Sequence, residues 1–318
     1  MKFSIGIPAF KARFLKECID SILTQTFSDF ELIIVNDASP ENIDDIVKSY
    51  SDSRIRYYVN EKNFGAEHVV DNWNKCLSYA LGAFFVLMGD DDLMAPTYLE
   101  EFDKLISKFP DLDVYHCRSM IINEDSDPIT LTQSLPEYES VYDNIWQRMN
   151  GWRFQYISDF VYRTNSLKKN GGFYYNKLAW ASDDISSFIA MRFKGIAHIN
   201  SPIFSYRRSR ISISSTGAVE LKLQAIMQEE KWYKDFLNSS TPNNKHDRIL
   251  KNNIENNLSK YIKKKRIQTI VSHGYNSNQL LKDYLRWFKK RRKYQLSSKE
   301  LVYSVILLLK DKEVKRLR

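Results

Sequence analysis

Short apolar runs alternate with amphipathic segments along the first 96 residues, and this alternation constrains the fold more than any other feature of the sequence. The run at 32–35 is mostly β-branched and nearly continuous, which is typical of a strand buried on both faces of a parallel sheet. Between the runs, apolar residues recur at helical spacing. Strands are expected at 3–7, 32–35, 55–59 and 83–88, and helices at 12–25, 43–50 and 66–81. Strands that alternate with helices predict an α/β fold with a doubly wound, mostly parallel sheet flanked by helices.

Beyond Pro96 the pattern becomes mixed. A helix is expected to run to Phe109, short strands are expected around Val114 and Val161, and a further helix is expected from Asp184 to Lys194. This half is expected to complete the same domain.

Acidic residues follow two of the predicted strands. Asp37 comes after the run at 32–35, and Asp90, Asp91 and Asp92 come directly after the run at 83–88. Open α/β sheets bind their ligands outside the carboxyl ends of the strands. Because adjacent carboxylates repel one another, we expect a divalent cation to bind between them. Mg²⁺ or Mn²⁺ would accept phosphate oxygens as further ligands. The alternative is a solvated turn that caps the helix after Pro96.

Several sequence blocks occur in an order that resembles family 2 glycosyltransferases of the GT-A fold, over about residues 1–215. Each block is weak alone, and the ordered set is specific. They are Ile5-Gly6-Ile7-Pro8-Ala9-Phe10, residues 18–27, residues 31–41, Asn63-Phe64-Gly65, Asn72-Trp73-Asn74-Lys75, Ala80-Leu81-Gly82, residues 89–96, Gly171-Gly172-Phe173, Ser182-Asp183-Asp184 and residues 206–212.

The resemblance implies an inverting, metal-dependent hexosyltransferase-like enzyme. It would move a sugar from a nucleotide diphosphate donor, expected first to be UDP-linked, to an acceptor hydroxyl on a glycan or lipid-linked glycan in bacterial surface polysaccharide assembly. Asp184 would be the general base, with Asp183 as the alternative. Mn²⁺ or Mg²⁺ would bind at Asp92 and Asp90. The nucleotide-sugar residues would be Pro8, Ala9, Phe10, Asp37, Asn63, Asp90, Asp91, Arg207, Arg208 and Arg210, and the acceptor residues Trp180 and Tyr174.

Three positions depart from the family pattern. Gly89 and Asn36 stand where relatives often have Asp, and Ser209 stands where many have His. The assignment of metal ligands within residues 90–92 therefore stays open, and the nearby arginines are candidates to hold the diphosphate by charge-assisted hydrogen bonds. Asp183 and Asp184 would also suit a helix N-terminus without any catalytic role. Core packing is the alternative for Trp180 and Tyr174.

The charge changes sign along the chain. Residues 1–219 carry 23 Lys and Arg against 29 Asp and Glu, and residues 220–318 carry 24 against 10. We expect a catalytic domain over 1–219, with a nucleotide-sugar half at about 1–112 and an acceptor half at about 113–219, followed by a helical basic region over 220–318. The basic region suits an anionic membrane surface, a partner protein or the phosphates of a nucleic acid.

Rival functions explain less of the sequence. A nucleic-acid-binding protein would not need the acidic body, so no nucleic-acid partner is expected. A sugar nucleotidyltransferase would carry a glycine-rich phosphate loop after the first strand, and a dehydrogenase would carry GxGxxG there. The sequence after Ile7 contains neither motif, which argues against both functions. Three separated cysteines and an N-terminus that enters a strand at once predict a cytoplasmic protein, with peripheral contact to the inner face of the membrane. The five histidines lack metal-ligand spacing and are expected to be structural or at the surface.

Overall fold

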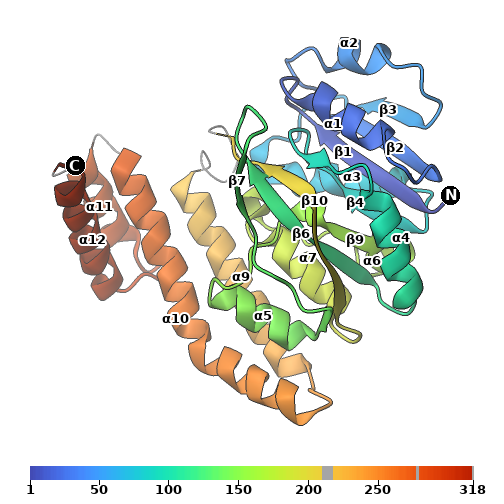
Figure 1. Ribbon diagram of the computed structural model, residues 1–318. Helices are drawn as coiled ribbons and strands as arrows, with labels where there is room; N and C mark the ends of the chain where they lie inside the picture. Colours follow the sequence, from blue (N-terminus) through green and yellow to red (C-terminus); the bar gives the residue numbers. More distant parts are fainter. Residues whose placement is uncertain (210–217, 277–278, 317–318) are drawn as a thin grey trace. The chain divides into compact units, whose positions relative to one another are not determined.

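The computed structural model describes residues 1–209, 218–276 and 279–316. The described chain forms two compact units. The first comprises residues 1–175 together with 182–209, and the second comprises residues 176–181 together with the described residues from 218 onward. Figure 1 shows the sheet of the first unit and the helices of the second.

A ten-stranded mixed sheet forms the first unit, in the order β3-β2-β1-β4-β9-β6-β10-β5, with β7 beside β6 and β8 beside β10. The first four of these strands are parallel, β9 is antiparallel to both neighbours, and β6 and β10 are parallel to each other. The α/β fold with a largely parallel sheet is thus confirmed. The strands are β1 (Phe3–Ala9), β2 (Phe30–Asn36), β3 (Ile55–Val59), β4 (Phe84–Leu87), β5 (Leu93–Met94), β6 (Val114–Ile122), β7 (Pro128–Leu131), β8 (Tyr138–Glu139), β9 (Phe160–Arg163) and β10 (Ile196–Arg207).

Helices cover both faces of this sheet (Figure 1). Alternate residues of β1 point to opposite faces. Ile5 packs in a core with residues of α1, α2 and α4, while Gly6 faces α3, where an added Cβ would lie 2.8 Å from the Cβ of Cys76. The helices of this unit are α1 (Leu15–Leu23), α2 (Ile43–Lys48), α3 (Val69–Tyr79), α4 (Tyr98–Lys108), α5 (Val141–Met149), α6 (Thr164–Lys169) and α7 (Ser182–Met191), with short 3₁₀ turns η1 (Ala66–His68) and η2 (Ile157–Asp159).

The acceptor half differs from the sequence prediction in its details. The helix expected to reach Lys194 ends at Met191, because Gly195 adopts φ +72° and its N–H closes the helix on the Met191 carbonyl. The strand expected around Val114 runs for nine residues, and the twelve-residue β10 was not predicted. Polar residues interrupt the apolar pattern of β10, so its local sequence does not indicate a strand. The strand forms because β10 pairs with its neighbours in the sheet.

The second unit is helical, as predicted for the C-terminal region. It contains η3 (Lys177–Ala179), α9 (Val219–Ser239), α10 (Lys245–Asn276), α11 (Leu280–Lys290) and α12 (Ser298–Arg316). The buried Glu229 of α9 accepts hydrogen bonds from Lys265 and Tyr261 of α10, at 2.5 and 3.2 Å. Among the helices that the structure describes, none combines the length and apolar character that crossing a bilayer would require.

Candidate active site

The acidic turn Gly89–Asp92 follows β4 and lies against the turn that follows β1. Oδ2 of Asp90 accepts the backbone N–H groups of Phe10 and Lys11, each at 2.8 Å. Nζ of Lys11 lies 3.2 Å from Oδ2 of Asp91. The neighbouring parallel strands β1 and β4 thus bring their carboxyl ends together, as the strand pattern predicted. Pro8 and Ala9 end β1, and Phe10 is partly exposed beside them.

Asp92 is held from two other elements. Its Oδ1 accepts the backbone N–H of Arg207 at the end of β10, at 2.9 Å, and its Oδ2 accepts the hydroxyl of Ser158 in η2, at 3.2 Å. The Ser158 hydroxyl also accepts the N–H of Gly89, at 3.0 Å. Asp92 therefore joins the two halves of the sheet at the site.

Asp37 lies at the end of β2 and is buried. Its Oδ1 accepts from Nδ2 of Asn60 at 2.8 Å and from the N–H of Phe64 at 3.1 Å. These bonds hold the loop that contains Asn63, whose own Oδ1 accepts from the N–H of Gly65. Asp37 and the acidic turn lie at the same edge of the sheet, because β2, β1 and β4 are consecutive parallel strands.

Asp184 lies in the first turn of α7 and pairs with an arginine that the sequence did not single out. Nη2 of Arg148, in the last turn of α5, donates to Oδ2 of Asp184 at 2.5 Å. Oδ1 of Asp184 is buried and has no hydrogen-bond partner within the described residues. Oδ1 of Asp183 accepts the N–H of Asp184 at 2.9 Å, so Asp183 caps the helix locally. Asp184 thus presents one oriented oxygen, as a general base requires.

Arg207 is almost fully buried and its guanidinium is engaged by the protein itself. Its Nε donates to the Asp91 carbonyl at 2.8 Å, Nη1 donates to Ser126 at 2.9 Å, and Nη2 pairs with Glu17 at 2.9 Å. These contacts tie β10 to the acidic turn and to α1. Arg208 follows with its side chain exposed, and Arg210 lies outside the described residues.

The two acceptor candidates belong to different compact units. Tyr174 is in the first unit, where its N–H donates to Ser186 of α7 at 2.8 Å. Trp180 is in the second unit, where Nζ of Lys222 lies 5.4 Å from its ring centroid. The bond to Ser186 places Tyr174 beside the helix that carries Asp184.

Gly89 leaves space that fits a divalent cation between carboxylates. A Cβ at this position would lie 2.6 Å from Oδ2 of Asp92 and 3.5 Å from Oδ1 of Asp91, so both oxygens border the space above the glycine. Across the described residues, no three His, Cys, Asp or Glu side chains gather as a ready-made metal cage. Two hard carboxylate oxygens fit Mg²⁺ or Mn²⁺ when substrate phosphates and water complete the coordination.

The electrostatics of the turn also favour a cation. Burial, and then the charge of Asp91, raise the pKa of Asp90 to about 6. The same two causes raise the pKa of Asp92 well above its usual range. Lys11 supplies one positive charge. Burial opposes its ammonium form, but the charges of Asp91 and Asp90 favour that form more strongly, so the pKa of Lys11 is raised. Burial and mutual repulsion thus disfavour the ionised forms of Asp90 and Asp92, and a bound cation would favour them.

Sequence reasoning missed three contributors to the site: Lys11, Arg148 and Ser158. Of the three, Lys11 could have been found from the sequence, because it is a basic residue that directly follows the Pro8-Ala9-Phe10 block at the end of a predicted strand. Arg148 and Ser158 are brought in by tertiary packing, and nothing in their local sequence indicates it.

Comparison with known families decides the identity. A sequence model described as Glycosyl transferase family 2 matches residues 4–194. The chain belongs to this family. The matched range carries β1, β2, the acidic turn and Asp184, so the described geometry is that of a family 2 glycosyltransferase.

Relatives of this family 2 glycosyltransferase cover only part of its sequence. The glycosyltransferase GlyA of Streptococcus pneumoniae is 27% identical over 165 residues, which are 50% of this chain and 23% of GlyA. The chondroitin synthase of Pasteurella multocida is 28% identical over 136 residues, which are 42% of this chain and 14% of the synthase. The chain therefore spans less than a quarter of the length of either relative.

Solved structures share the fold over nearly the whole chain. Staphylococcus aureus TarS residues 1–349, in complex with UDP-GlcNAc, superposes with a TM-score of 0.65 at 16% identity, covering 98% of this chain and 92% of that one. The Pyrobaculum calidifontis mannosyltransferase PcManGT, in complex with GDP-Man and Mn²⁺, gives 0.53 at 14% identity, with 98% and 88% covered. These similarities confirm the GT-A-like fold and the helical region that follows it.

Proposed function

We propose that the protein transfers a sugar with inversion from a nucleotide diphosphate donor to an acceptor hydroxyl. The observation that carries the proposal is the pairing, within one compact unit, of an acidic turn at the ends of parallel strands with a buried, arginine-oriented carboxylate. Asp90, Asp91 and Asp92 form the turn, and Asp184 is the carboxylate. The family assignment supports the same chemistry.

Asp184 acts as the base in the proposed displacement. Its partner-free Oδ1 takes the proton of the acceptor hydroxyl while the acceptor oxygen bonds to the anomeric carbon. The bond from that carbon to the diphosphate oxygen breaks on the opposite face, and the nucleotide diphosphate leaves with both electrons. Asp183, which caps the same helix, is the alternative base. A positioned base contributes on the order of 10²–10⁴-fold to the rate.

The diphosphate would lie between the acidic turn and the turn after β1. When bound, Mg²⁺ or Mn²⁺ would neutralise the charge that develops on the leaving phosphate. Asp92, whose Oδ2 borders the space beside Gly89, and Asp90 are the proposed ligands of the ion, and Asp91, which borders the same space, is the alternative. Arg208, which is exposed, is available to contact the phosphates, while Arg207 holds the protein together around them.

The nucleotide would occupy the edge formed by Pro8, Ala9, Phe10, Asp37 and Asn63. Asp37 would recognise the base, since its carboxylate already orders the loop that carries Asn63. A UDP-linked donor is expected first, and the fold similarity to TarS with bound UDP-GlcNAc supports that choice. A glycan or lipid-linked glycan acceptor in surface polysaccharide assembly is the matching acceptor class.

Thermal unfolding with a panel of nucleotide sugars tests this assignment. A UDP-linked sugar with Mn²⁺ should raise the unfolding temperature, because a ligand that binds only the folded state stabilises it by mass action. Asp92→Asn should remove the Mn²⁺-dependent part of the shift. If no nucleotide sugar stabilised the wild-type protein at any metal concentration, the proposal would be wrong.

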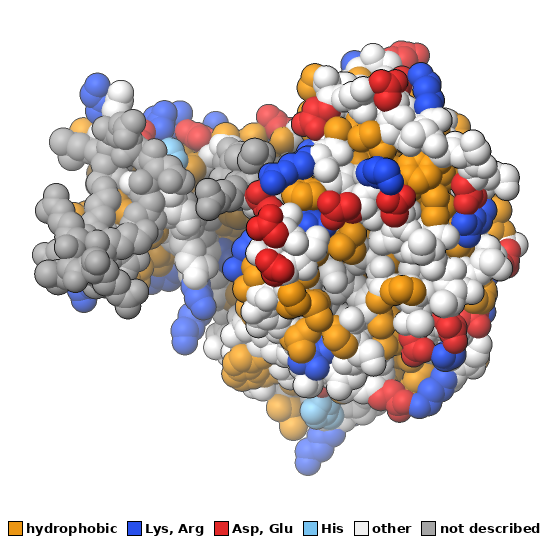
Figure 2. Space-filling model, turned by 45° about the horizontal axis from the view of Figure 1, so that its top comes forward, with side chains coloured by type: hydrophobic (Ala, Val, Ile, Leu, Met, Phe, Trp, Pro, Cys, Tyr) orange, Lys and Arg blue, Asp and Glu red, His pale blue; other side chains and the backbone are white. Residues whose placement is uncertain are grey.

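The catalytic domain is proposed to comprise residues 1–219, and the basic helical region residues 220–318. Figure 2 shows acidic and basic side chains interspersed over the visible face of the first unit, with no purely basic surface there. Because residues 220–318 carry 24 Lys and Arg against 10 Asp and Glu, we infer that the C-terminal region makes the contact with an anionic partner.

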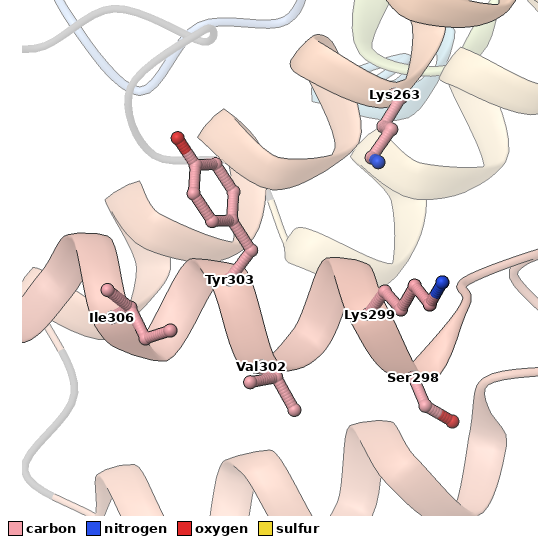
Figure 3. Close-up of a pocket in the computed structure, with 6 residues that line it drawn as sticks. All are labelled: Lys263, Ser298, Lys299, Val302, Tyr303 and Ile306. Carbon is pink, nitrogen blue, oxygen red and sulfur yellow. The ribbon is translucent and has the colours of Figure 1, made fainter.

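The C-terminal helices carry a surface suited to a membrane. An open groove of about 470 Å³ is lined by Lys263 of α10 and by Ser298, Lys299, Val302, Tyr303 and Ile306 of α12 (Figure 3). Val302, Tyr303 and Ile306 are 59%, 50% and 44% exposed. Exposed apolar side chains beside ammonium groups support the proposal of peripheral binding to anionic lipid, with the cytoplasmic face of the membrane as the proposed location.

Flotation with liposomes tests the membrane contact. Phosphatidylserine vesicles should carry the protein upward and phosphatidylcholine vesicles should not. Val302→Asp with Ile306→Asp should abolish flotation, whereas Ile249→Asp, at a 52% exposed position of α10 outside the groove, should not. Equal flotation of both variants would overturn this part of the proposal.

A further inference from the structure

Two buried histidines face each other from neighbouring strands of the sheet. His116 of β6 and His198 of β10 are paired in register on neighbouring parallel strands. Both side chains are fully buried, and their Nδ1 atoms lie 3.1 Å apart at hydrogen-bond geometry. One Nδ1 must therefore carry a hydrogen and the other must accept it.

Each histidine meets a carboxylate with its other ring nitrogen. Nε2 of His198 lies 3.0 Å from Oε1 of Glu139, and Nε2 of His116 lies 3.1 Å from Oδ1 of Asp159. These contacts form a chain of four side chains, which runs from Asp159 through both imidazoles to Glu139, and all four groups are buried.

Three donors converge on Oε1 of Glu139 and favour its ionised form, while its Oε2 has no hydrogen-bond partner within the described residues. Its Oε1 accepts from Nη1 of Arg153 at 2.5 Å and from Nδ2 of Asn144 at 2.7 Å, besides His198. Burial opposes the charged form of Glu139, but the bond from His198 and the charge of Arg153 outweigh it and hold its pKa below the usual range. Because Glu139 can only accept, His198 donates to it from Nε2.

Counting hydrogens along the chain leaves one proton to place. A neutral His198 that donates from Nε2 must accept at Nδ1, so His116 donates from Nδ1. A neutral His116 then has a bare lone pair at Nε2, which lies 3.1 Å from Oδ1 of Asp159, and neither atom has a hydrogen-bond partner within the described residues. Leaving both buried atoms unsatisfied is costly, and a proton on one of them would let the two atoms pair.

The surroundings favour placing that proton on Asp159. Burial lowers the pKa of His116 to about 3, and burial raises the pKa of Asp159 well above its usual range. With a neutral acid at Asp159, the charges of Glu139 and Arg153 cancel and the buried chain is neutral. The other charged or titratable groups that face Asp159 are Tyr98 of α4, Cys117 of β6, Arg148 of α5, Tyr156 before η2, Tyr162 of β9 and Asp184 of α7.

We propose that Asp159 works as a neutral carboxylic acid that donates to His116, and that the chain from Asp159 to Glu139 positions both halves of the active site. This role deepens the proposed transfer activity and rests on it for its kinetic consequences. Asp159, His116, His198 and Glu139 are positioning residues, since none of them forms a hydrogen bond or ion pair with Asp92 or Asp184 within the described part of the chain.

One end of the chain supports the acidic turn. Oδ2 of Asp159 accepts from Ser119 at 2.8 Å and from the N–H of Tyr156 at 3.0 Å, which fixes the η2 turn. The adjacent residue, Ser158, donates to Asp92. The orientation of the Asp92 carboxylate therefore depends on the turn that Asp159 closes.

The other end supports the base. Glu139 holds Arg153, whose carbonyl accepts from Nη1 of Arg148 at 2.8 Å. Nη2 of the same arginine donates to Asp184. Arg148 is therefore aimed at Asp184 by the residue that Glu139 fixes.

A matched pair of neutral isosteres tests the proposal. In Asp159→Asn the amide oxygen can accept from Ser119 and Tyr156 while the amide NH₂ donates to His116, so the variant reproduces the neutral acid. We expect kcat within about twofold of wild type. In Glu139→Gln an ionised acceptor is lost beside Arg153, and we expect kcat to fall by roughly tenfold or more, with donor KM changing less. Asp159→Ala should resemble Glu139→Gln.

The pH dependence separates this role from simple packing. The raised pKa of Asp159 stabilises the fold at low pH, and this contribution is lost as pH rises through the folded-state pKa. Asp159→Asn cannot lose the proton, so its unfolding temperature relative to wild type should rise with pH, measured without substrate. The infrared carbonyl band of protonated carboxyls should also be weaker in Asp159→Asn than in wild type, and the part that remains belongs to other carboxyls with raised pKa values, such as Asp90 and Asp92.

The outcomes are decisive in either direction. If Asp159→Asn is as damaging as Glu139→Gln, or if its unfolding temperature shows the same pH dependence as wild type, Asp159 is ionised and the proposal is wrong. Because unfolding and infrared measurements need no sugar donor, their result stands even if the transfer activity itself were not found.

Discussion

Nη2 of Arg148 lies 2.5 Å from Oδ2 of Asp184 and leaves Oδ1 of the same carboxylate without a hydrogen-bond partner in the described part of the chain. An arginine that binds one oxygen fixes the direction in which the other can take a proton. This relationship separates Asp184 from Asp183, whose Oδ1 caps the helix.

Asp184→Asn should abolish transfer while leaving sugar-donor binding nearly unchanged, because an amide keeps the shape but cannot accept the proton. We expect a fall in kcat on the order of 10²–10⁴-fold. Transfer rates and calorimetric donor binding would be measured for this variant and for Asp183→Asn as the matched control. Normal turnover by Asp184→Asn with loss of activity in Asp183→Asn would reverse the assignment.

Arg148→Gln should lower kcat with little change in the KM for the sugar donor, because it releases the carboxylate that Arg148 orients. A misplaced group of this kind costs up to about 10²-fold in rate. Arg13→Gln is the control, since Arg13 forms an ion pair with Glu124 and its side chain is 63% exposed. Equal effects of the two substitutions on kcat would argue against an orienting role.

Gly89→Ala should weaken Mn²⁺ binding by roughly 10–100-fold, the usual range for disturbing the groups that orient metal ligands. The added methyl group would lie 2.6 Å from Oδ2 of Asp92 and would displace it. Paramagnetic resonance of free Mn²⁺ measures the affinity directly. Gly151→Ala is the control, because it adds backbone strain at φ +72° that Gly89 does not have but places nothing within 4 Å of the new Cβ, and it should leave the affinity unchanged. Unaltered Mn²⁺ affinity in Gly89→Ala would place the ion elsewhere.

Glu31→Gln should destabilise the protein at neutral pH and have little effect in acid. Glu31 of β2 is buried and accepts from Ser4 at 2.6 Å, from Arg56 at 2.5 Å and from the N–H of Leu81 at 2.8 Å. Burial opposes its charged form, but these bonds outweigh burial and lower its pKa. The charged form therefore stabilises the fold above the unfolded-state pKa, and this stability is lost as pH falls through the folded-state pKa.

Urea unfolding at two pH values measures the effect. We expect a loss of about 1–3 kcal/mol at pH 7, since Arg56 is partly exposed, shrinking toward zero near pH 3. Glu101→Gln, in an exposed pair with Lys104, should change stability by no more than about 0.5 kcal/mol at either pH. A loss in Glu31→Gln that did not depend on pH would mean that packing, rather than charge, explains its role.

The sequence predicted the first half of the fold well because its signals are local. The apolar run 32–35 indicates a strand directly, and the acidic residues after residue 88 mark the end of another strand, where polar groups gather. The family resemblance then supplied the fold type, which the structural similarity to TarS confirms.

The second half could not be predicted in the same detail, because its features depend on pairing between distant residues. β10 contains Asn200, Ser201 and Pro202, which break the apolar alternation, and its register with β6 shifts near that proline. His116 and His198 were expected to have ordinary structural roles. Their sequence separation of 82 residues gives no sign that they share a hydrogen bond. Arg148 likewise reaches Asp184 only because α5 packs on α7.

The in-register pairing of β6 and β10 has a consequence for recombining this protein with its relatives. Side chains alternate between faces along a strand, so moving β10 by one residue would turn His198 to the opposite layer and leave His116 facing a backbone or an apolar neighbour. A chimera that exchanged β10 could keep every catalytic carboxylate and still separate the imidazoles. Crossover points should therefore preserve the spacing from His198 to Arg207, the distance along one strand that links the buried histidines to the acidic turn.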